Sequence, residues 1–494
     1  MRTEDPVVRQ GFKRRLPLPG GVGGRPVAAP FFLLFAGVAA YAFTGSLLCF
    51  LPAFAALYGV LLVYDFKSAY WVLLCCVPLS FHVEFLNNSF SLALPTEPVM
   101  LLFYLLALMI ILVRKESLPS WWLRNSITVV ILLQFAWLIV AVCCSRVPLL
   151  SLKFLLSKSW YLVCFFLIPA WIIRTRHDFR IAFTVLLLPL LLYIGIILVR
   201  HAAYGFRFYY IDAAVGSLFY KHVDYASVIS MFFPFVLFAG SRREGRKGPH
   251  YLLLFLALLF LVAIGLSFTR AAMGGVLFGF VVILAIRLRL AQFIIPGFYI
   301  LCLALLFYFA KGNRFLQYHP YFQDTYMRHE FADHLKATVA GKDMSSVERL
   351  YRWIAALRMS ADQPLTGFGP HSFYYYYKPY TLSAYRTYVS ENYEHSTTHN
   401  YFLYLMAEQG IPAMLLYAVL VLLVFVKAQG VYHRLKDGFY KRLTLAIAMS
   451  FAVFFVNNLF SELLETDKVG PMVYLLLAAL VIVDHKSRTG QELS

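Results

Sequence analysis

Long apolar stretches recur along nearly the whole chain, and they constrain its fold more than any other feature. A helix needs about 20 predominantly apolar residues to cross the hydrocarbon core of a bilayer. Stretches of about this length are predicted near residues 29–44, 46–64, 68–83, 98–113, 125–144, 152–173, 180–201, 218–240, 251–269, 271–287, 290–310, 400–426, 443–460 and 468–484. Hydrophobic residues make up 61% of the 494 positions and charged residues 14%, fewer charges than soluble domains carry. We therefore expect an all-α polytopic membrane protein with about 12–14 transmembrane helices, the first two being short and closely joined.

The charged residues predict how these helices are oriented. The chain has 44 Lys and Arg against 25 Asp and Glu, a net charge of +19. If the basic N-terminal tail (1–28) is cytoplasmic, alternation places further basic segments on the same side: 114–124, 174–180, 241–250, 427–442 and the C-terminal tail (485–494). The opposite side receives the acidic or nearly neutral segments 84–97 and 461–468, as the positive-inside rule requires. The charge pattern thus indicates membrane topology and contact with lipids, and we expect no nucleic-acid partner. The tail has no small-residue cleavage site after a short apolar core, so we do not interpret it as a signal peptide.

Cysteine and acidic residues give no sign of a cofactor. All seven cysteines lie inside apolar stretches, without metal-ligand spacing to histidine, and a disulfide framework is not expected. The sequence has no paired-histidine helix motif, no Asp-rich cluster and no Asp-x-Asp motif of the kind that binds nucleotide sugars. We therefore predict neither a metal site nor another cofactor, and a soluble sugar-nucleotide donor is disfavoured.

One loop is much longer than a helix connection requires. Residues 311–398 separate the transmembrane bundle (29–310) from the C-terminal transmembrane helices (399–484), and alternation places them on the extracytoplasmic side. We predict an ordered cap with short helices, including a helix over 348–361 that a capping box from Ser345 to Glu348 opens. The tyrosine-rich stretch 374–393 is interpreted either as ordinary cap core or as a platform on which sugar rings stack.

Arginines at the predicted outer face are candidates for binding an anion. Arg270 lies in a tight turn between two apolar stretches, and Arg349 lies on the predicted cap helix with Arg352 and Trp353. Arg207 belongs to another predicted outer loop. Each could instead be a solvated or membrane-anchoring charge. Guanidinium groups that converge on one point would suit a phosphate or diphosphate, because their planar fork donates bidentate hydrogen bonds.

A histidine marks the point where the long loop re-enters the membrane. His399 is a candidate general base, although an interfacial histidine can also be structural, and the nearby His395 is an alternative. Asn400, Tyr404 and Glu408 fall on one face of the following helix. Glu408 is costly to bury in an apolar stretch, which makes it a candidate functional residue. Gly410-Ile411-Pro412 should bend or interrupt this helix.

Three blocks of the sequence resemble the O-antigen ligase and O-antigen polymerase superfamily of bacterial membrane glycosyltransferases. Ser267-Phe268-Thr269-Arg270-Ala271 is similar to the family's Ser-Arg-Gly-type turn, with Thr269 and Ala271 as departures. Arg349–Trp353 followed by Pro364–Gly369 resembles its Arg-x3-Trp and Pro-Leu-x-Gly-x-Gly pattern. His399-Asn400 with Glu408-x-Gly410 resembles its His-Asn-x7-Glu-x-Gly stretch. The likeness is best over residues 200–430.

The resemblance implies a GT-C-like helical fold and a metal-independent O-antigen ligase-like glycosyltransferase in the bacterial inner membrane. Its active site would face the periplasm, and its donor would be a glycan on undecaprenyl diphosphate. Arg270 and Arg349 would hold the diphosphate, and His399 would activate an acceptor hydroxyl on lipid A–core or a similar saccharide. Substrate contacts are expected from Arg207, Arg352, Trp353, Asn400, Tyr404 and Glu408.

Two other functions remain open at the level of sequence. A polymerase that extends a growing polysaccharide would share the same motifs and chemistry. A transporter of lipid-linked oligosaccharides is the alternative from another class, although the polar residues gather at one face rather than along several helices. The identity of the glycan and the oligomeric state stay open.

Overall fold

A computed structural model describes residues 51–85, 90–114, 119–240, 247–318, 344–393 and 395–490, with isolated positions 33, 36 and 49 before them. Its contacts divide the chain into two compact units. Unit 1 comprises residues 1–116 and 177–189, and unit 2 comprises residues 117–176 and 190–494. The predicted span at 29–44 lies outside the described residues except for positions 33 and 36.

Unit 1 consists of short helices and one hairpin. Its elements are α3 (Leu51–Tyr64), α4 (Phe66–Leu79), strands β1 (Phe81–Phe85) and β2 (Phe90–Leu94), α5 (Thr96–Arg114) and the first part of α10 (Arg176–Ala203). The strands pair antiparallel, with Phe81 opposite Leu94. The ring of Phe103 on α5 packs on Phe66 and Tyr70 of α4. The prediction of one span over 68–83 is therefore wrong at its end, because the helix stops at Leu79 and the chain turns into a strand.

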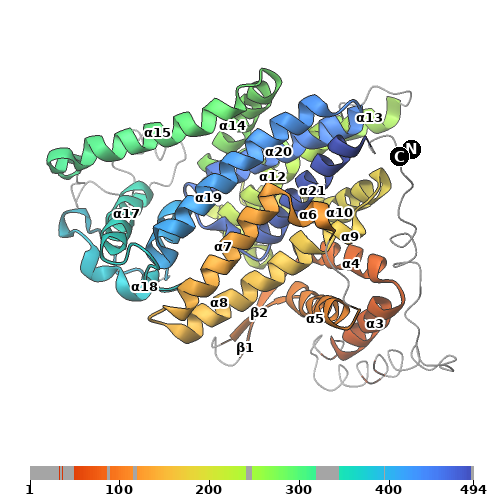
Figure 1. Cartoon of the computed structure of the whole chain (residues 1–494), viewed down its shortest axis with the longest axis horizontal. Helices are drawn as coiled ribbons and strands as arrows, with labels where there is room; N and C mark the ends of the chain where they lie inside the picture. Colours follow the sequence, from red (N-terminus) through yellow and green to blue (C-terminus); the bar gives the residue numbers. More distant parts are fainter. Residues whose placement is uncertain are drawn as a thin grey trace. The chain divides into compact units, whose positions relative to one another are not determined.

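Unit 2 is a bundle of long helices (Figure 1). Its helices are α6 (Ser120–Leu123), α7 (Ser126–Cys143), α8 (Pro148–Tyr161), α9 (Pro169–Ile172), the rest of α10, α11 (Ile211–Val215), α12 (His222–Gly240), α13 (Lys247–Leu266), α14 (Arg270–Arg287), α15 (Ala291–Ala310), α17 (Met344–Asp362), α18 (Phe373–Tyr376), α19 (Tyr401–Arg434), α20 (Gly438–Asn458) and α21 (Val469–Thr489). A π-helical segment, Leu162–Leu167, continues α8 toward α9.

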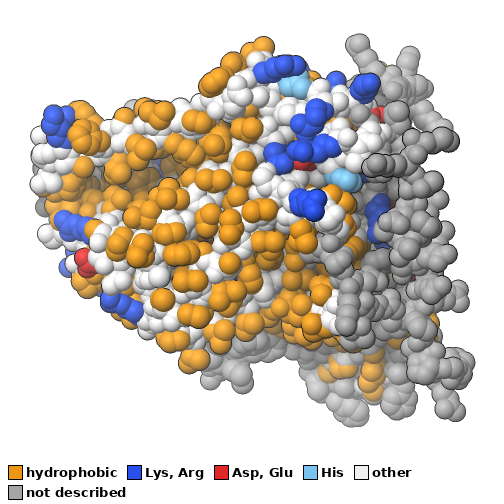
Figure 2. Space-filling model, viewed as in Figure 1, with side chains coloured by type: hydrophobic (Ala, Val, Ile, Leu, Met, Phe, Trp, Pro, Cys, Tyr) orange, Lys and Arg blue, Asp and Glu red, His pale blue; other side chains and the backbone are white. Residues whose placement is uncertain are grey.

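Within the described ranges, nine helices are long and apolar enough to cross a membrane, and four shorter helices are also apolar. Each predicted span beyond residue 46 corresponds to one of these helices or to part of one. The fold is thus an all-α polytopic membrane protein, as predicted, with the β1–β2 hairpin as an unpredicted addition. Figure 2 shows the matching surface, where hydrophobic side chains cover α7, α8 and the outward face of α19, and Lys and Arg side chains gather toward the end of α19.

Glycines allow α14 to pack closely against α20. A Cβ on Gly279 would lie 2.7 Å from the side chain of Met449, and one on Gly275 would lie 3.1 Å from the carbonyl of Val453. A step of four residues forward on α14 thus corresponds to four residues back on α20, so the two helices run antiparallel. The start of α14, at Arg270, therefore lies level with the end of α20, at Asn458.

Helix α19 is broken where the sequence predicted a bend. Gly410 adopts φ 82° and ψ 173°, outside the helical region, so the prediction is confirmed. Because Gly410 has no Cβ, the backbone of Leu365 can approach it closely. A Cβ at this position would lie 1.8 Å from the Leu365 carbonyl oxygen. The Phe368 amide donates to the Ala407 carbonyl (3.1 Å), and the Ile411 amide donates to the Pro364 carbonyl (2.8 Å). The break therefore docks the cap onto the bundle.

Candidate functional site

The first residues of α19 have a fixed backbone. Asn400 is the N-cap, and its side-chain oxygen accepts a hydrogen bond from the Leu403 amide (3.1 Å). Its side-chain nitrogen donates to the Leu459 carbonyl at the end of α20 (3.1 Å). The preceding residue, His399, adopts φ +53°, in the left-handed region that non-glycine residues seldom occupy. Asn400 therefore sets the direction in which His399 leaves the helix.

A carboxylate from the loop after α20 lies beside His399. Glu462 accepts hydrogen bonds from the Thr398 hydroxyl (2.9 Å) and the Asn400 amide (3.3 Å). Its second oxygen lies 3.9 Å from Nδ1 of His399, too far for a direct hydrogen bond. Burial, opposed by these hydrogen bonds, raises the pKa of Glu462. Sequence reasoning missed Glu462, because this residue lies in a short acidic loop that resembles an ordinary connection between helices.

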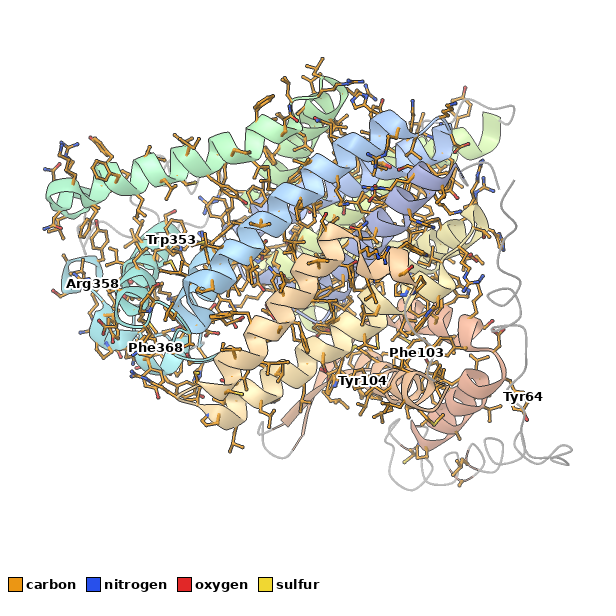
Figure 3. All side chains as sticks on the ribbon, in the orientation of Figure 1. Tyr64, Phe103, Tyr104, Trp353, Arg358 and Phe368 are labelled. Atoms are coloured by element: carbon orange, nitrogen blue, oxygen red, sulfur yellow. The ribbon has the colours of Figure 1, made fainter. Side chains whose placement is uncertain are left out.

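Helix α17 carries the cap side chains that face this region. The Trp353 indole donates to the carbonyl of Thr398 (2.9 Å), which ties α17 to the residue before His399. The Arg349 guanidinium lies 5.9 Å from the centre of the Phe460 ring and donates to the Ser345 hydroxyl (2.8 Å). Figure 3 labels Trp353 at the end of the bundle that carries α17. Trp353 therefore contacts the residue before His399, and Arg349 lies one helical turn before Trp353 on α17.

The cap helix begins differently from the prediction. It spans Met344–Asp362, longer than the predicted 348–361. The Ser345–Glu348 capping box is wrong, since the Ser345 hydroxyl contacts Arg349 and the Glu348 carboxylate accepts from Ser390 (2.6 Å) and pairs with Arg352 (3.4 Å). Ser390 is 42 residues from Glu348, so local spacing could not identify it, whereas Arg349 and Arg352 are the i,i+4 neighbours of Ser345 and Glu348 on the same helix.

Three cations act on the His399 imidazole. Burial, followed by the positive charges of Arg352, Arg349 and Lys221, lowers the pKa of His399 from an ordinary 6.5 to about 3. The imidazole is therefore neutral at physiological pH and can accept a proton. Lys221, in the turn before α12, is a cation that sequence reasoning missed. Its signal was weak, because a single lysine before an apolar stretch usually only marks topology.

Two further arginines of the prediction, Arg270 and Arg207, lie on other elements. Arg270 begins α14, level with the end of α20, and Arg349 lies near Phe460 in the loop that follows α20. Arg207 is exposed, in a segment whose neighbour Phe208 packs against Phe268 with the ring centres 5.6 Å apart. The Phe208–Phe268 contact therefore brings the segment of Arg207 to the turn before Arg270. No contact among the described residues joins the Arg207 side chain to His399.

Tyr404 and Glu408 are enclosed within the protein. The Glu408 carboxylate accepts hydrogen bonds from the amides of His371 (2.6 Å) and Phe373 (2.9 Å) and from Tyr404. These contacts fix the cap segment after Gly369 to α19. The arrangement favours a positioning role for this pair over direct contact with a substrate.

The tyrosine-rich stretch divides between the two predicted interpretations. Tyr377 and Tyr385 are buried in a hydrophobic core with Phe368 and Met359, which Figure 3 locates through the Phe368 label. Tyr388 and Tyr393 are exposed. His395 is exposed and stacks on Tyr374, with ring centres 3.9 Å apart, rather than facing the arginines. Among the described residues, no group of three or more His, Cys, Asp or Glu side chains could hold a metal ion.

The fold and site define a class: a polytopic membrane protein in which cationic side chains surround a neutral histidine where a cap meets the bundle. Residues 255–418 match the family model described as O-antigen ligase. The matched region runs from α13 into α19 and includes Arg270, Arg349 and His399. It supports the place of this chain in the O-antigen ligase and polymerase superfamily, as the sequence motifs indicated. No curated protein sequence is significantly similar to the chain.

Proposed function

We propose that this protein is an O-antigen ligase-like glycosyltransferase. It transfers a glycan from undecaprenyl diphosphate to an acceptor hydroxyl of lipid A–core or a similar saccharide, without a metal ion. The observation that carries the proposal is the neutral imidazole of His399 within the field of Arg349, Arg352 and Lys221. One end of the bundle thus combines a proton acceptor with positive charge.

The proposed reaction needs both features. When the acceptor oxygen attacks the anomeric carbon, the bond to the diphosphate breaks and negative charge grows on the leaving group. Fixed guanidinium groups, Arg349 and Arg270, stabilise that charge at no reorganisation cost. His399 takes the proton of the attacking hydroxyl, and attack from the face opposite the diphosphate inverts the anomeric configuration.

The proposal places this end of the bundle on the periplasmic face of the bacterial inner membrane. The support is the charge pattern: Lys427 and Arg434 lie near the far end of α19, and the start of that helix adjoins a neutral-to-acidic loop. A lipid-linked donor and a membrane-anchored acceptor would both reach such a site from the lipid.

Reconstituted protein in proteoliposomes, supplied with an undecaprenyl-diphosphate-linked glycan and lipid A–core, tests the proposal. His399→Ala and Arg349→Ala should abolish transfer while leaving the protein inserted in the membrane. Arg358→Ala is the matched control, because Arg358 lies on the same helix and its guanidinium donates to the Tyr380 and Thr381 carbonyls (3.3 and 3.4 Å) of the cap. Full activity of His399→Ala at normal protein level would refute the mechanism, and loss of activity in EDTA that Mg²⁺ restores would refute its metal independence.

A polymerase shares the same geometry and differs only in acceptor. Replacing lipid A–core by a second lipid-linked repeat unit in the same assay separates the two. Products extended by one repeat would assign polymerase activity, and a glycan attached to lipid A–core would assign ligase activity.

A further inference from the structure

An exposed group of aromatic side chains lies beside the proposed site. The segment between α10 and α11 presents Tyr204, Tyr209 and Tyr210, whose exposed fractions are 42%, 64% and 36%. Tyr220, in the turn before α12, is 74% exposed. We call these four tyrosines the aromatic platform. Large aromatic side chains gain free energy by covering their faces, so four exposed ones in two adjoining turns point to a ligand.

Three rings of the platform, those of Tyr204, Tyr209 and Tyr210, are ordered against one another. Tyr204 and Tyr210 are stacked, with ring centres 5.0 Å apart and planes inclined by 15°. Tyr209 meets Tyr210 edge to face at 5.1 Å. A pre-arranged set of rings loses little conformational entropy when it binds, which suits a flat, weakly apolar ligand such as the face of a sugar ring.

Polar groups adjoin the rings. Asp212 accepts hydrogen bonds from the His222 amide (3.0 Å) and from His222 Nδ1 (2.7 Å), and its side chain is 63% exposed. Burial raises the pKa of Asp212, but the His222 hydrogen bonds and the charge of Lys221 outweigh this and lower it, so the carboxylate is ionised. Sugar hydroxyls need such acceptors, and a few placed polar groups beside apolar surface are typical of ligand sites. The Asp212–His222 hydrogen bonds also join the Tyr210 turn to the Tyr220 turn.

The platform is continuous with the proposed site on two sides. Phe208 and His201 both pack against Phe268, two residues before Arg270, with ring centres 5.6 and 6.0 Å apart. On the other side, Tyr220 precedes Lys221, whose charge acts on His399. Lys468 fixes this turn, because its Nζ donates to the Leu218 carbonyl (2.6 Å).

We propose that the aromatic platform, with Asp212, binds the saccharide of the acceptor. The proposal rests on the proposed function. In the proposed reaction His399 contacts the attacking hydroxyl of the acceptor. The turn that contains Lys221, whose charge acts on His399, also contains Tyr220 and is hydrogen-bonded to Asp212. The acceptor sugar therefore extends over Tyr220 and Asp212. An aromatic belt at the membrane interface would need the rings but not the exposed carboxylate among them.

Binding of lipid-free saccharide to the full-length protein in nanodiscs tests the proposal without requiring transfer. Two probes are used: core oligosaccharide released from lipopolysaccharide by mild acid, and a delipidated repeat unit. Binding of each probe is measured by saturation-transfer NMR. We expect the Tyr204→Ala/Tyr210→Ala double variant to bind one or both probes about tenfold more weakly. The Tyr204→Phe/Tyr210→Phe double variant keeps the rings and should bind within about twofold of the wild type.

Tyr251→Ala controls for loss of an exposed tyrosine, since Tyr251 lies at the far end of α13 from Arg270 and is 64% exposed. Equal binding by the alanine double variant and the wild type overturns the proposal, even if the variant is less stable in nanodiscs. Wild-type protein that binds neither probe also overturns it. His399→Ala should keep saccharide binding while losing transfer, so failure of the proposed function appears in transfer and failure of the platform appears in binding.

Discussion

His399 is held in a left-handed backbone conformation, which costs of the order of 1–3 kcal/mol for a non-glycine residue. The cost is offset by neighbours that fix the residues on both sides. Trp353 holds the Thr398 carbonyl, and Glu462 holds the Thr398 hydroxyl and the Asn400 amide. Strain held at this residue favours a functional role.

The depressed pKa of His399 predicts a particular pH dependence. With a free-enzyme pKa of about 3, the base stays neutral down to pH 5, so kcat/KM should show no acid limb near 6.5. A bound diphosphate compensates the charges of Arg349 and Arg352, which raises the pKa of His399 in the complex. The acid limb of kcat should therefore lie at higher pH than that of kcat/KM. Steady-state rates between pH 5 and 9 check this, and a kcat/KM limb at about 6.5 would contradict it.

Glu462 predicts a graded response to substitution. Glu462→Gln keeps an acceptor for Thr398 but removes the negative charge 3.9 Å from His399 Nδ1, whereas Glu462→Ala removes both. We expect kcat to fall about tenfold for Gln and about a hundredfold for Ala, less than the loss in His399→Ala. A positioning role also predicts that the acid limb of kcat shifts to lower pH in Glu462→Gln, since a nearby negative charge favours the imidazolium. An unchanged pH profile would leave Glu462 with a structural role alone.

At the scale of elements, the break in α19 joins cap to bundle. The segment Pro364–Gly369 contacts the backbone of residues 407–411 through hydrogen bonds on both sides of Gly410. Gly367 also has positive φ (+63°), and a Cβ there would lie 2.4 Å from the Glu408 backbone. Glycine is therefore required on both segments, at Gly367 in the cap and at Gly410 in α19, because the two backbones approach too closely for a Cβ.

Gly410→Ala should strongly destabilise this junction. The new methyl would lie 1.8 Å from the Leu365 carbonyl oxygen, and alanine would have to adopt φ +82°. We expect a loss of more than about 3 kcal/mol, seen as a lower melting temperature in detergent and reduced transfer. Gly297→Ala in α15 is the control, because nothing lies within 4 Å of its Cβ position and its φ is not positive. A Gly410→Ala protein as stable as this control would show that the cap does not depend on the break.

At the scale of the whole molecule, α19 connects two polar centres of unit 2. His399 precedes its first residue, and Lys427 and Arg434 lie near its end, roughly 40 Å away at 1.5 Å per residue. There Asp484 of α21, which is 1% exposed, pairs with Lys427 (3.0 Å), Arg434 (2.6 Å) and Arg488 (3.1 Å). This cluster links α19 to α21 at the end remote from the proposed chemistry.

Asp484→Asn should therefore lower stability without changing the reaction. Loss of the Asp484 carboxylate leaves three cations around a buried, uncharged amide. We expect the free energy of unfolding to fall by about 2–4 kcal/mol and the KM for both substrates to stay unchanged. Glu391→Gln is the control, because Glu391 is 42% exposed and pairs with exposed Arg386 and Lys378, an arrangement worth little. Melting temperature and steady-state kinetics of the same preparations check both parts. A melting temperature equal to that of Glu391→Gln, or an altered KM, would contradict the prediction.

The sequence alone determined the helical membrane fold, nearly every span and the interruption at Gly410, and it singled out Arg349, Trp353 and His399 as candidate site residues. It could do so because lipid imposes span length and charge on contiguous segments, and because the motifs are local. Only the tertiary structure decided the hairpin after Leu79, the real partners of Ser345 and Glu348, and the approach of Glu462 and Lys221 to His399. The pairing of Glu348 with Ser390, and the placement of Glu462 and Lys221 near His399, involve residues far apart in sequence, and short-range periodicity carries no information about such pairs.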